Sequence, residues 1–91
     1  MTSNTPTVQD GYMPETVAEK IRSRLRVRLE LPQPDERRAL REAAGLTQED
    51  IAEALGVTRA AVGHWETGAR SPRGRLLTEY VDVIRVLRES A

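Results

Sequence analysis

The chain has 91 residues, with 14 basic and 14 acidic side chains, a formal net charge of +0, 38% hydrophobic residues and 3% aromatic residues. This length accommodates one domain with a small core, and the scarcity of aromatic residues favours packed helices over a sheet. The chain has no cysteine and one histidine, which excludes a disulfide framework, a thiolate zinc site and a cysteine nucleophile.

The N-terminal third is predicted to be a disordered tail followed by a helix and a proline linker. Residues 1–12 mix polar residues with Pro and Gly without periodicity, which is typical of a disordered tail. A helix is predicted from Pro14 to about Leu29, within an N-terminal segment spanning residues 13–34. An alternation of apolar residues with arginines also fits a strand, but the chain offers no second strand for pairing. The run Leu31–Pro34 ends the helix.

Four apolar residues of this segment recur at every fourth position: Val17, Ile21, Leu25 and Leu29. Such spacing places them on one face of a helix. We expect this face to pack on the rest of the domain.

The remainder of the chain, residues 35–91, is predicted to form short helices separated by glycines. Thr47 and Thr58 are good N-cap residues, and Gly45, Gly56 and Gly68 are positioned to end the preceding helices. Four helices are expected, over residues 35–44, 48–55, 59–67 and 75–89.

The stretch from Leu46 to Pro72 has the pattern of two short helices that cross at a tight turn. Gly56 can take the positive φ that the turn requires. Ala52 is small enough to let the helices approach, and Val62 is placed to point inward and lock the crossing. This is the helix-turn-helix pattern, in which the second helix enters the major groove of DNA.

Residues 35–88 resemble the phage repressor and Cro-like helix-turn-helix family, also called the xenobiotic-response-element family. The resemblance implies an all-α fold, a lambda-repressor-like helix-turn-helix bundle of about five short helices with a disordered N-terminal tail. The residues that carry it are Leu40–Gln48, Ile51–Ala52, Leu55–Val57, Val62–Gly68, Arg70 and Pro72, with the closing pattern W-E-x-G-x-R-x-P.

The resemblance also implies a set of DNA contacts. The recognition helix, residues 59–67, would present its exposed side to base edges in the major groove. Arg59 is the strongest candidate for base reading because its guanidinium matches guanine O6 and N7. The expected base contacts are Arg59, Ala60, Ala61 and His64. The expected phosphate contacts are Thr47, Gln48, Thr58, Thr67, Arg70 and Arg73.

The same resemblance places Arg41 and Glu66 together as an ion pair between helices, beneath the surface that faces DNA. Glu66 lies near a helix C-terminus, where the helix dipole disfavours a carboxylate, so a cationic partner is favourable. Trp65, beside Glu66, is expected to pack in the core rather than stack on a base.

Five cations crowd the predicted N-terminal helix: Lys20, Arg22, Arg24, Arg26 and Arg28. Three interpretations of the segment stay open. The cations can form the polar face of an amphipathic helix or an additional arm on the DNA backbone. The segment can instead dimerise through Val17, Ile21 and Leu25.

We expect a cytoplasmic, bacterial or phage transcriptional regulator that binds double-stranded DNA sequence-specifically and acts as a repressor. Two alternatives are a helix-turn-helix module for protein interaction, which the charge of +0 permits, and an antitoxin that binds a protein partner through residues 1–34. No catalytic, metal or cofactor motif is found, and no apolar run approaches the roughly 18 residues of a membrane span. A homodimer on two half-sites is compatible with one short recognition helix.

Overall fold

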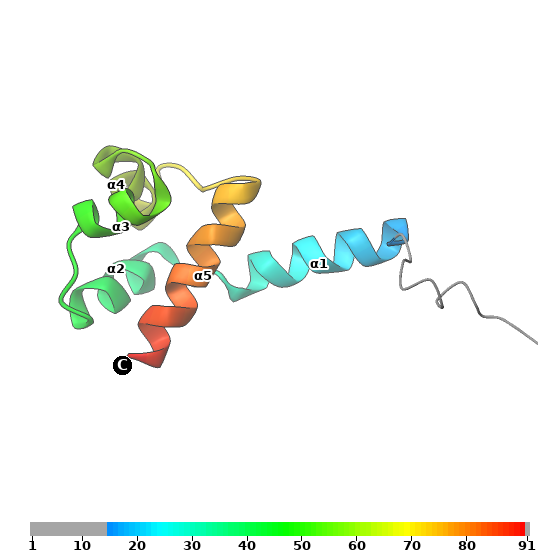
Figure 1. The fold of residues 1–91 in the computed structure, drawn as a ribbon, viewed down its shortest axis with the longest axis horizontal. Helices are drawn as coiled ribbons and strands as arrows, with labels where there is room; N and C mark the ends of the chain where they lie inside the picture. The colour runs from blue at the N-terminus through cyan, green and yellow to red at the C-terminus, as the bar shows by residue number, and fades with distance from the viewer. Residues whose placement is uncertain (1–14, 91) are drawn as a thin grey trace, which may run out of the picture.

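The computed structural model describes residues 15–90, which form five helices and no strand (Figure 1). The all-α fold and the helix-turn-helix bundle are thereby confirmed, and the N-terminal segment is helical rather than extended. The predicted tail, residues 1–12, lies outside the described residues. The helices are α1 (Val17–Glu30), α2 (Pro34–Ala43), α3 (Gln48–Leu55), α4 (Arg59–Thr67) and α5 (Arg75–Glu89).

Side chains at the helix starts explain most of these bounds. The Thr47 hydroxyl accepts a hydrogen bond from the Asp50 N–H at 3.0 Å, and the Asp50 carboxylate accepts one from the Thr47 N–H at 2.8 Å. Thr58 caps α4 in the predicted way. A capping box that the sequence analysis did not anticipate, between Thr16 and Glu19, starts α1. Each cap satisfies backbone donors that a helix start leaves unpaired.

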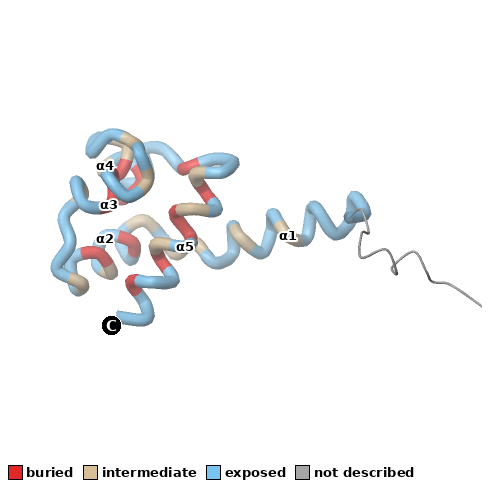
Figure 2. The backbone as a smooth tube through the Cα atoms, viewed as in Figure 1, coloured by how far each residue is buried: buried red, intermediate tan, exposed pale blue. Residues whose placement is uncertain are grey.

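Helices α2 to α5 enclose one small core, seen as the red segments in Figure 2. Ala52 and Val62 are 0% exposed, as the close crossing of α3 and α4 requires. The Trp65 ring lies in the core with its centroid 4.9 Å from that of Tyr80. The other buried apolar residues are Ile51, Leu77, Val81, Ile84 and Leu87.

Burial of Tyr80 leads to a prediction for alkaline pH. Loss of solvation raises the pKa of its phenol to about 12, above the ordinary value of 10.0. The neutral form is therefore favoured in the folded state, and we expect stability to fall as the pH rises from about 10 to 12. Absorbance titration of a Tyr12→Phe variant checks this, because only Tyr80 then titrates. A phenol that ionises at about pH 10 in folded protein would contradict the prediction.

The expectation that the apolar face of α1 packs on the domain is wrong. The exposed fractions are 77% for Val17, 51% for Ile21, 53% for Leu25 and 86% for Leu29. Helix α1 projects from the bundle and contacts α5 near its own C-terminal end (Figure 1). Fourth-residue spacing identifies a helix face, but whether that face is covered depends on residues distant in sequence.

Exposure of this face predicts small effects of truncating it. Replacing Ile21 and Leu25 together by alanine is expected to change the free energy of unfolding by less than about 1 kcal/mol, because neither residue is buried. The matched control is Leu31→Ala, which removes a side chain packed against the core and should cost roughly 1–2 kcal/mol. Urea unfolding of both variants checks this, and an Ile21/Leu25 loss as large as that of Leu31 would contradict it.

Candidate nucleic-acid interface

The turn between α3 and α4 fixes the angle at which the second helix leaves the first. Gly56 has φ 71° and ψ 34°, a left-handed conformation that a side chain disfavours. The Val57 N–H then donates to the Ala52 carbonyl at 3.0 Å, closing α3. Two short helices joined in this way form a rigid unit whose second helix can be offered to a partner.

The outer side of α4 carries most of the predicted base-contacting residues. Arg59, Ala60 and His64 are exposed, and α4 lies at the edge of the bundle away from α1 (Figure 1). Ala61 differs from the other three, because it is half-buried and packs against the core. Three of the four side chains are thus exposed to solvent, and the fourth, Ala61, is partly exposed.

Gln48 lies between the start of α3 and the side of α4. Its side-chain amide donates to Glu66 Oε1 at 3.1 Å. The Gln48 side chain lies beside Gly63 of α4, where a Cβ would make ordinary van der Waals contact with it at 3.7 Å. Gln48 therefore braces the recognition helix and is also half-exposed at the surface.

A shallow hollow of about 450 Å³ lies at the start of α3. Three arginines border it, of which Arg38 pairs with Glu42 and Arg41 with Glu66. Arg59 takes part in none of the ion pairs within residues 15–90. Arg59 and the positive end of the α3 dipole are thus the groups that favour an anion there. Arg38 belongs to this hollow although the sequence analysis did not select it. The lining residues are Arg38, Arg41, Leu46, Thr47, Gln48, Glu49 and Arg59.

The ion pair of Arg41 and Glu66 lies beneath this hollow. Arg41 donates from Nε to Glu66 Oε2 at 2.6 Å and from a terminal nitrogen to Oε1 at 2.9 Å, with a further bond to the Leu46 carbonyl at 2.8 Å. Both side chains are buried. Such a two-pronged contact fixes α2 against α4.

Opposing effects act on the Glu66 carboxylate. Burial alone would raise its pKa, but hydrogen bonds from Arg41 and Gln48 outweigh burial and hold the pKa below the ordinary 4.5. The hydrogen bonding between Arg41 and Glu66 also raises the pKa of Arg41. The pair is therefore charged at neutral pH, and its three donors satisfy the buried carboxylate.

Arg37 makes a second buried link between α2 and α4 that the sequence analysis missed. It donates to the Pro32 carbonyl at 2.7 Å and to the Trp65 carbonyl at 2.8 Å, and burial lowers its pKa. The available signal was its position four residues before Arg41, which puts both arginines on one face of α2.

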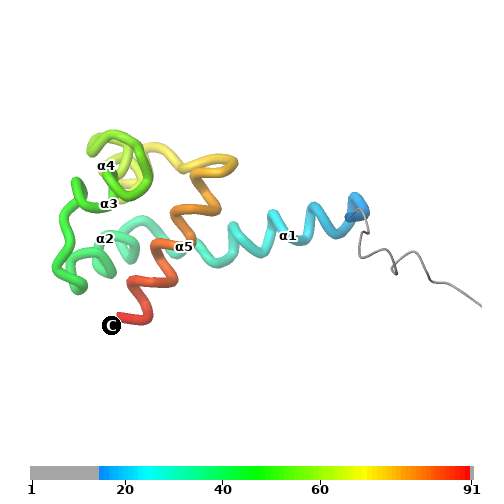
Figure 3. The backbone as a smooth tube through the Cα atoms, viewed as in Figure 1, coloured from blue at the N-terminus to red at the C-terminus, as the bar shows by residue number. Residues whose placement is uncertain are grey.

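The remaining candidates for phosphate contact differ in whether their polar groups already form hydrogen bonds within the protein. The Thr67 hydroxyl donates to the His64 carbonyl at 3.2 Å, so it is engaged in closing α4. The Thr58 hydroxyl accepts the Ala61 N–H at 3.1 Å. Arg70 and Arg73 are exposed on the segment between α4 and α5, drawn yellow in Figure 3. The two arginines are therefore the more available groups.

Two further findings concern residues 15–90. No group of three or more His, Cys, Asp or Glu side chains in this range is arranged to hold a metal ion. No helix in the same range is both long and apolar enough to span a bilayer.

Comparison with known proteins identifies one region of similarity. A family model described as helix-turn-helix matches residues 38–87, which is more than half of the chain. The match covers most of α2, all of α3 and α4, and α5 up to Leu87. No curated protein and no solved structure matches the chain.

Proposed function

The chain belongs to the phage-repressor and Cro-like helix-turn-helix family of DNA-binding regulators, and we propose that it represses transcription in the cytoplasm by occupying a specific operator. In this proposal α4 lies in the major groove, and polymerase is excluded from the occupied site. The observation that carries the proposal is the juxtaposition of the exposed side of α4 with the hollow at the start of α3, which Arg59 and Gln48 both line.

The proposal includes two kinds of contact with DNA, to phosphates and to base edges. Phosphates of one strand would be held at the hollow by Gln48, by the Thr47 hydroxyl and by arginine, and further along by Arg70 and Arg73. Those contacts set the register of α4, so that Arg59, Ala60 and His64 meet base edges, with Ala61 contributing at its margin. The support is that Thr47, Gln48 and Arg59 line a single hollow.

Recognition by so short a helix is expected to require two copies of the chain. We propose a homodimer on two half-sites whose centres lie about 34 Å apart, one turn of the duplex. The two alanines of α4 offer only methyl contacts, so part of the discrimination is expected from DNA shape.

Substitutions of Arg59 and Gln48 are expected to affect the sequence specificity of DNA binding differently. Arg59→Ala should weaken operator binding by roughly 1–3 kcal/mol and relax the preference at one base pair, because a base contact is lost. Gln48→Ala should weaken binding to all duplexes alike, because a phosphate contact carries no sequence information. Selection of bound fragments from the parent genome supplies the operator, and titration of operator and scrambled duplexes measures both effects.

Arg59 lies beside the hollow, so contact with a phosphate is the alternative to its proposed contact with a base. If Arg59→Ala costs the same on operator and scrambled duplexes, Arg59 contacts phosphate and base reading must come from other residues. Arg88→Ala, at the far end of α5, is a matched control that should leave DNA affinity unchanged. A salt series tests DNA binding itself, since affinity that does not fall with salt would instead favour a protein-interaction module.

A further inference from the structure

Helix α1 carries an apolar surface that no other part of residues 15–90 covers. Ile21 and Leu25 are about half exposed, and Val17 and Leu29 are more exposed still. A contiguous stripe of aliphatic side chains in water is unfavourable by roughly 25 cal/mol per Å² relative to a covered one. Uncovered stripes of this kind mark interaction surfaces.

Cations border this stripe on both edges beside Ile21, Leu25 and Leu29. Successive residues of a helix are turned by about 100°, which places Arg24 and Arg28 along one edge of the stripe and Arg22 and Arg26 along the other. The two carboxylates of α1 are engaged elsewhere, Glu19 in the cap of Thr16 and Glu30 in an ion pair with Arg85. None of the ion pairs within residues 15–90 uses the four arginines or Lys20.

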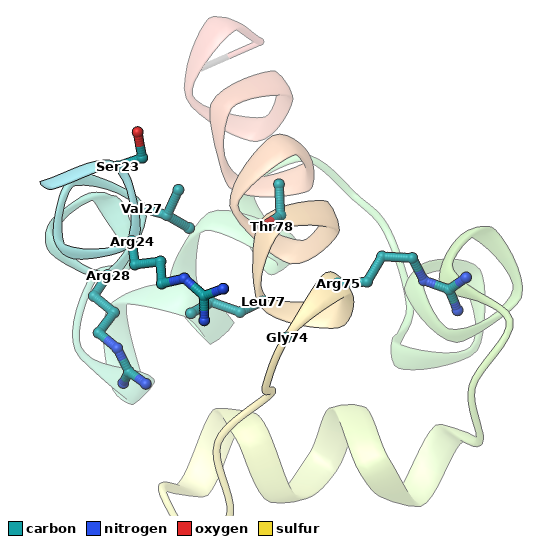
Figure 4. A pocket seen from close by; sticks show the side chains of 8 residues that line it. All are labelled: Ser23, Arg24, Val27, Arg28, Gly74, Arg75, Leu77 and Thr78. Atoms are coloured by element: carbon teal, nitrogen blue, oxygen red, sulfur yellow. The ribbon is translucent and has the colours of Figure 1, made fainter. Parts of the chain in front are cut away.

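A groove of about 410 Å³ adjoins the same surface where α1 meets the start of α5. Figure 4 shows Arg24 reaching from α1 towards Leu77, while Arg75 points to the opposite side. Val27 and Leu77 supply apolar lining, and the lining contains no carboxylate. The groove can thus receive a side chain that pairs an apolar stem with a negative charge. Its lining residues are Ser23, Arg24, Val27, Arg28, Gly74, Arg75, Leu77 and Thr78.

We propose that the stripe of α1 and the adjoining groove bind an acidic amphipathic helix of another protein. Apolar residues of that helix would cover Ile21 and Leu25, and its Asp and Glu residues would face the two arginine edges. Pairing an apolar stripe with opposite charges on its flanks is the pattern by which amphipathic helices select partners.

Charge argues against a second copy of this chain as the occupant. In either orientation of two α1 helices, an arginine edge of one copy would lie against an arginine edge of the other. Like charges facing one another are destabilising and reject such a pairing. The same argument favours a partner with the reverse charge.

DNA and membrane fit the surface less well than an acidic helix. Phosphates would neutralise the arginines but leave the aliphatic stripe in water, and α1 points away from α3 and α4 (Figure 1). Helices that lie on membranes bury a broad apolar face opposite their Lys and Arg residues, whereas the apolar stripe of α1 is narrow and has arginines directly on both of its edges. The aliphatic stripe and its arginine edges together are satisfied by one acidic, amphipathic protein helix.

The first test uses the full chain and a fluorescent synthetic helix with Leu at every third or fourth position and Glu on the flanks. Anisotropy should show saturable binding, weakened about tenfold or more by Ile21→Ala with Leu25→Ala, and also by Arg24→Glu. Val86→Glu, at an aliphatic residue of α5 that is also more than half exposed, is the matched control and should leave binding unchanged. Equal loss in all variants, or equal binding of a Lys-flanked peptide, would overturn the proposal.

The second test identifies the natural occupant. A photo-crosslinking residue at position 25 of the full chain should form an adduct with an acidic protein in the source cells. That protein, once purified, should bind the wild-type chain and lose about tenfold in affinity with the Ile21/Leu25 double variant. An adduct with a second copy, with DNA or with lipid would overturn the proposal, as would the absence of any adduct.

DNA affinity supplies an independent readout. Replacing Arg22, Arg24 and Arg26 together by glutamine should leave the salt dependence of duplex binding unchanged, because these arginines face the protein partner. If α1 is instead an arm on the DNA backbone, the slope of log affinity against log salt would fall by about one per lost contact, and the proposal would fail.

Discussion

Replacing Glu66 by alanine is expected to lower the free energy of unfolding by roughly 3–5 kcal/mol. The carboxylate accepts two bonds from Arg41 and one from Gln48, and the exposed fractions of the Arg41 and Glu66 side chains are 10% and 2%. Without it, Arg41 stays buried as an unpaired cation, and desolvation of that charge is uncompensated. Urea unfolding of the full chain measures the loss.

A double-mutant cycle separates this pair from an ordinary surface pair. With Arg41→Met as the second variant, we expect a coupling energy above about 1 kcal/mol. The matched control is Arg38 with Glu42, a 3.0 Å pair on the outer side of α2 whose side chains are 63% and 53% exposed. Its coupling should not exceed about 0.5 kcal/mol. Equal couplings in the two cycles would show that Arg41 and Glu66 contribute as separate charges.

The stabilisation by Glu66 should depend on pH with a definite sign. Because its pKa is lowered by folding, its contribution is present above the ordinary 4.5 and is lost as the pH falls through the lower folded value. The difference in stability between wild type and Glu66→Gln is therefore expected to shrink between neutral pH and about pH 3. A difference that stays constant over this range would contradict the hydrogen-bonded carboxylate.

Trp65→Ala is expected to cost roughly 3–5 kcal/mol, which is comparable with the whole stability of many small domains. The indole is 5% exposed and packs on Tyr80 between α4 and α5, so its loss leaves a cavity. Arg37 donates to the Trp65 carbonyl, which the variant retains, so the measured loss belongs to the side chain.

Circular dichroism during urea unfolding is the suitable measurement, because the variant lacks the single tryptophan. Leu46→Ala is the control, since Leu46 is 39% exposed and should lose less than about 1.5 kcal/mol. A loss for Trp65→Ala no larger than that of the control would show that the ring is not part of the core.

The sequence predicts best those features of the fold that depend on residues close to one another in the chain. Gly56 and the N-caps Thr47 and Thr58 act on their own neighbours, so their residue types alone indicate where α3 and α4 begin and turn. Ala52 and Val62 are predictable for a similar reason, since one small and one inward residue follow from the crossing of two adjacent helices.

Long-range contacts explain what the sequence could not predict. The stripe of α1 has the same spacing as a buried face, but α1 turns a different face, with Ser23 and Val27, towards α5 and leaves the stripe exposed. Arg37 looks like any exposed cation until Pro32 and Trp65, the latter 28 positions away, supply their carbonyls. The DNA contacts of Arg59 and its neighbours likewise stay predictions, because they depend on a partner molecule.

The network of Arg41, Glu66 and Gln48 has a consequence for the thermodynamics of recognition. It fixes α2, α3 and α4 to one another before any ligand arrives, so the reading surface is preorganised. Docking of such a surface need not include the entropy of ordering its backbone. The heat capacity change on association should therefore reflect the area brought into contact rather than coupled folding.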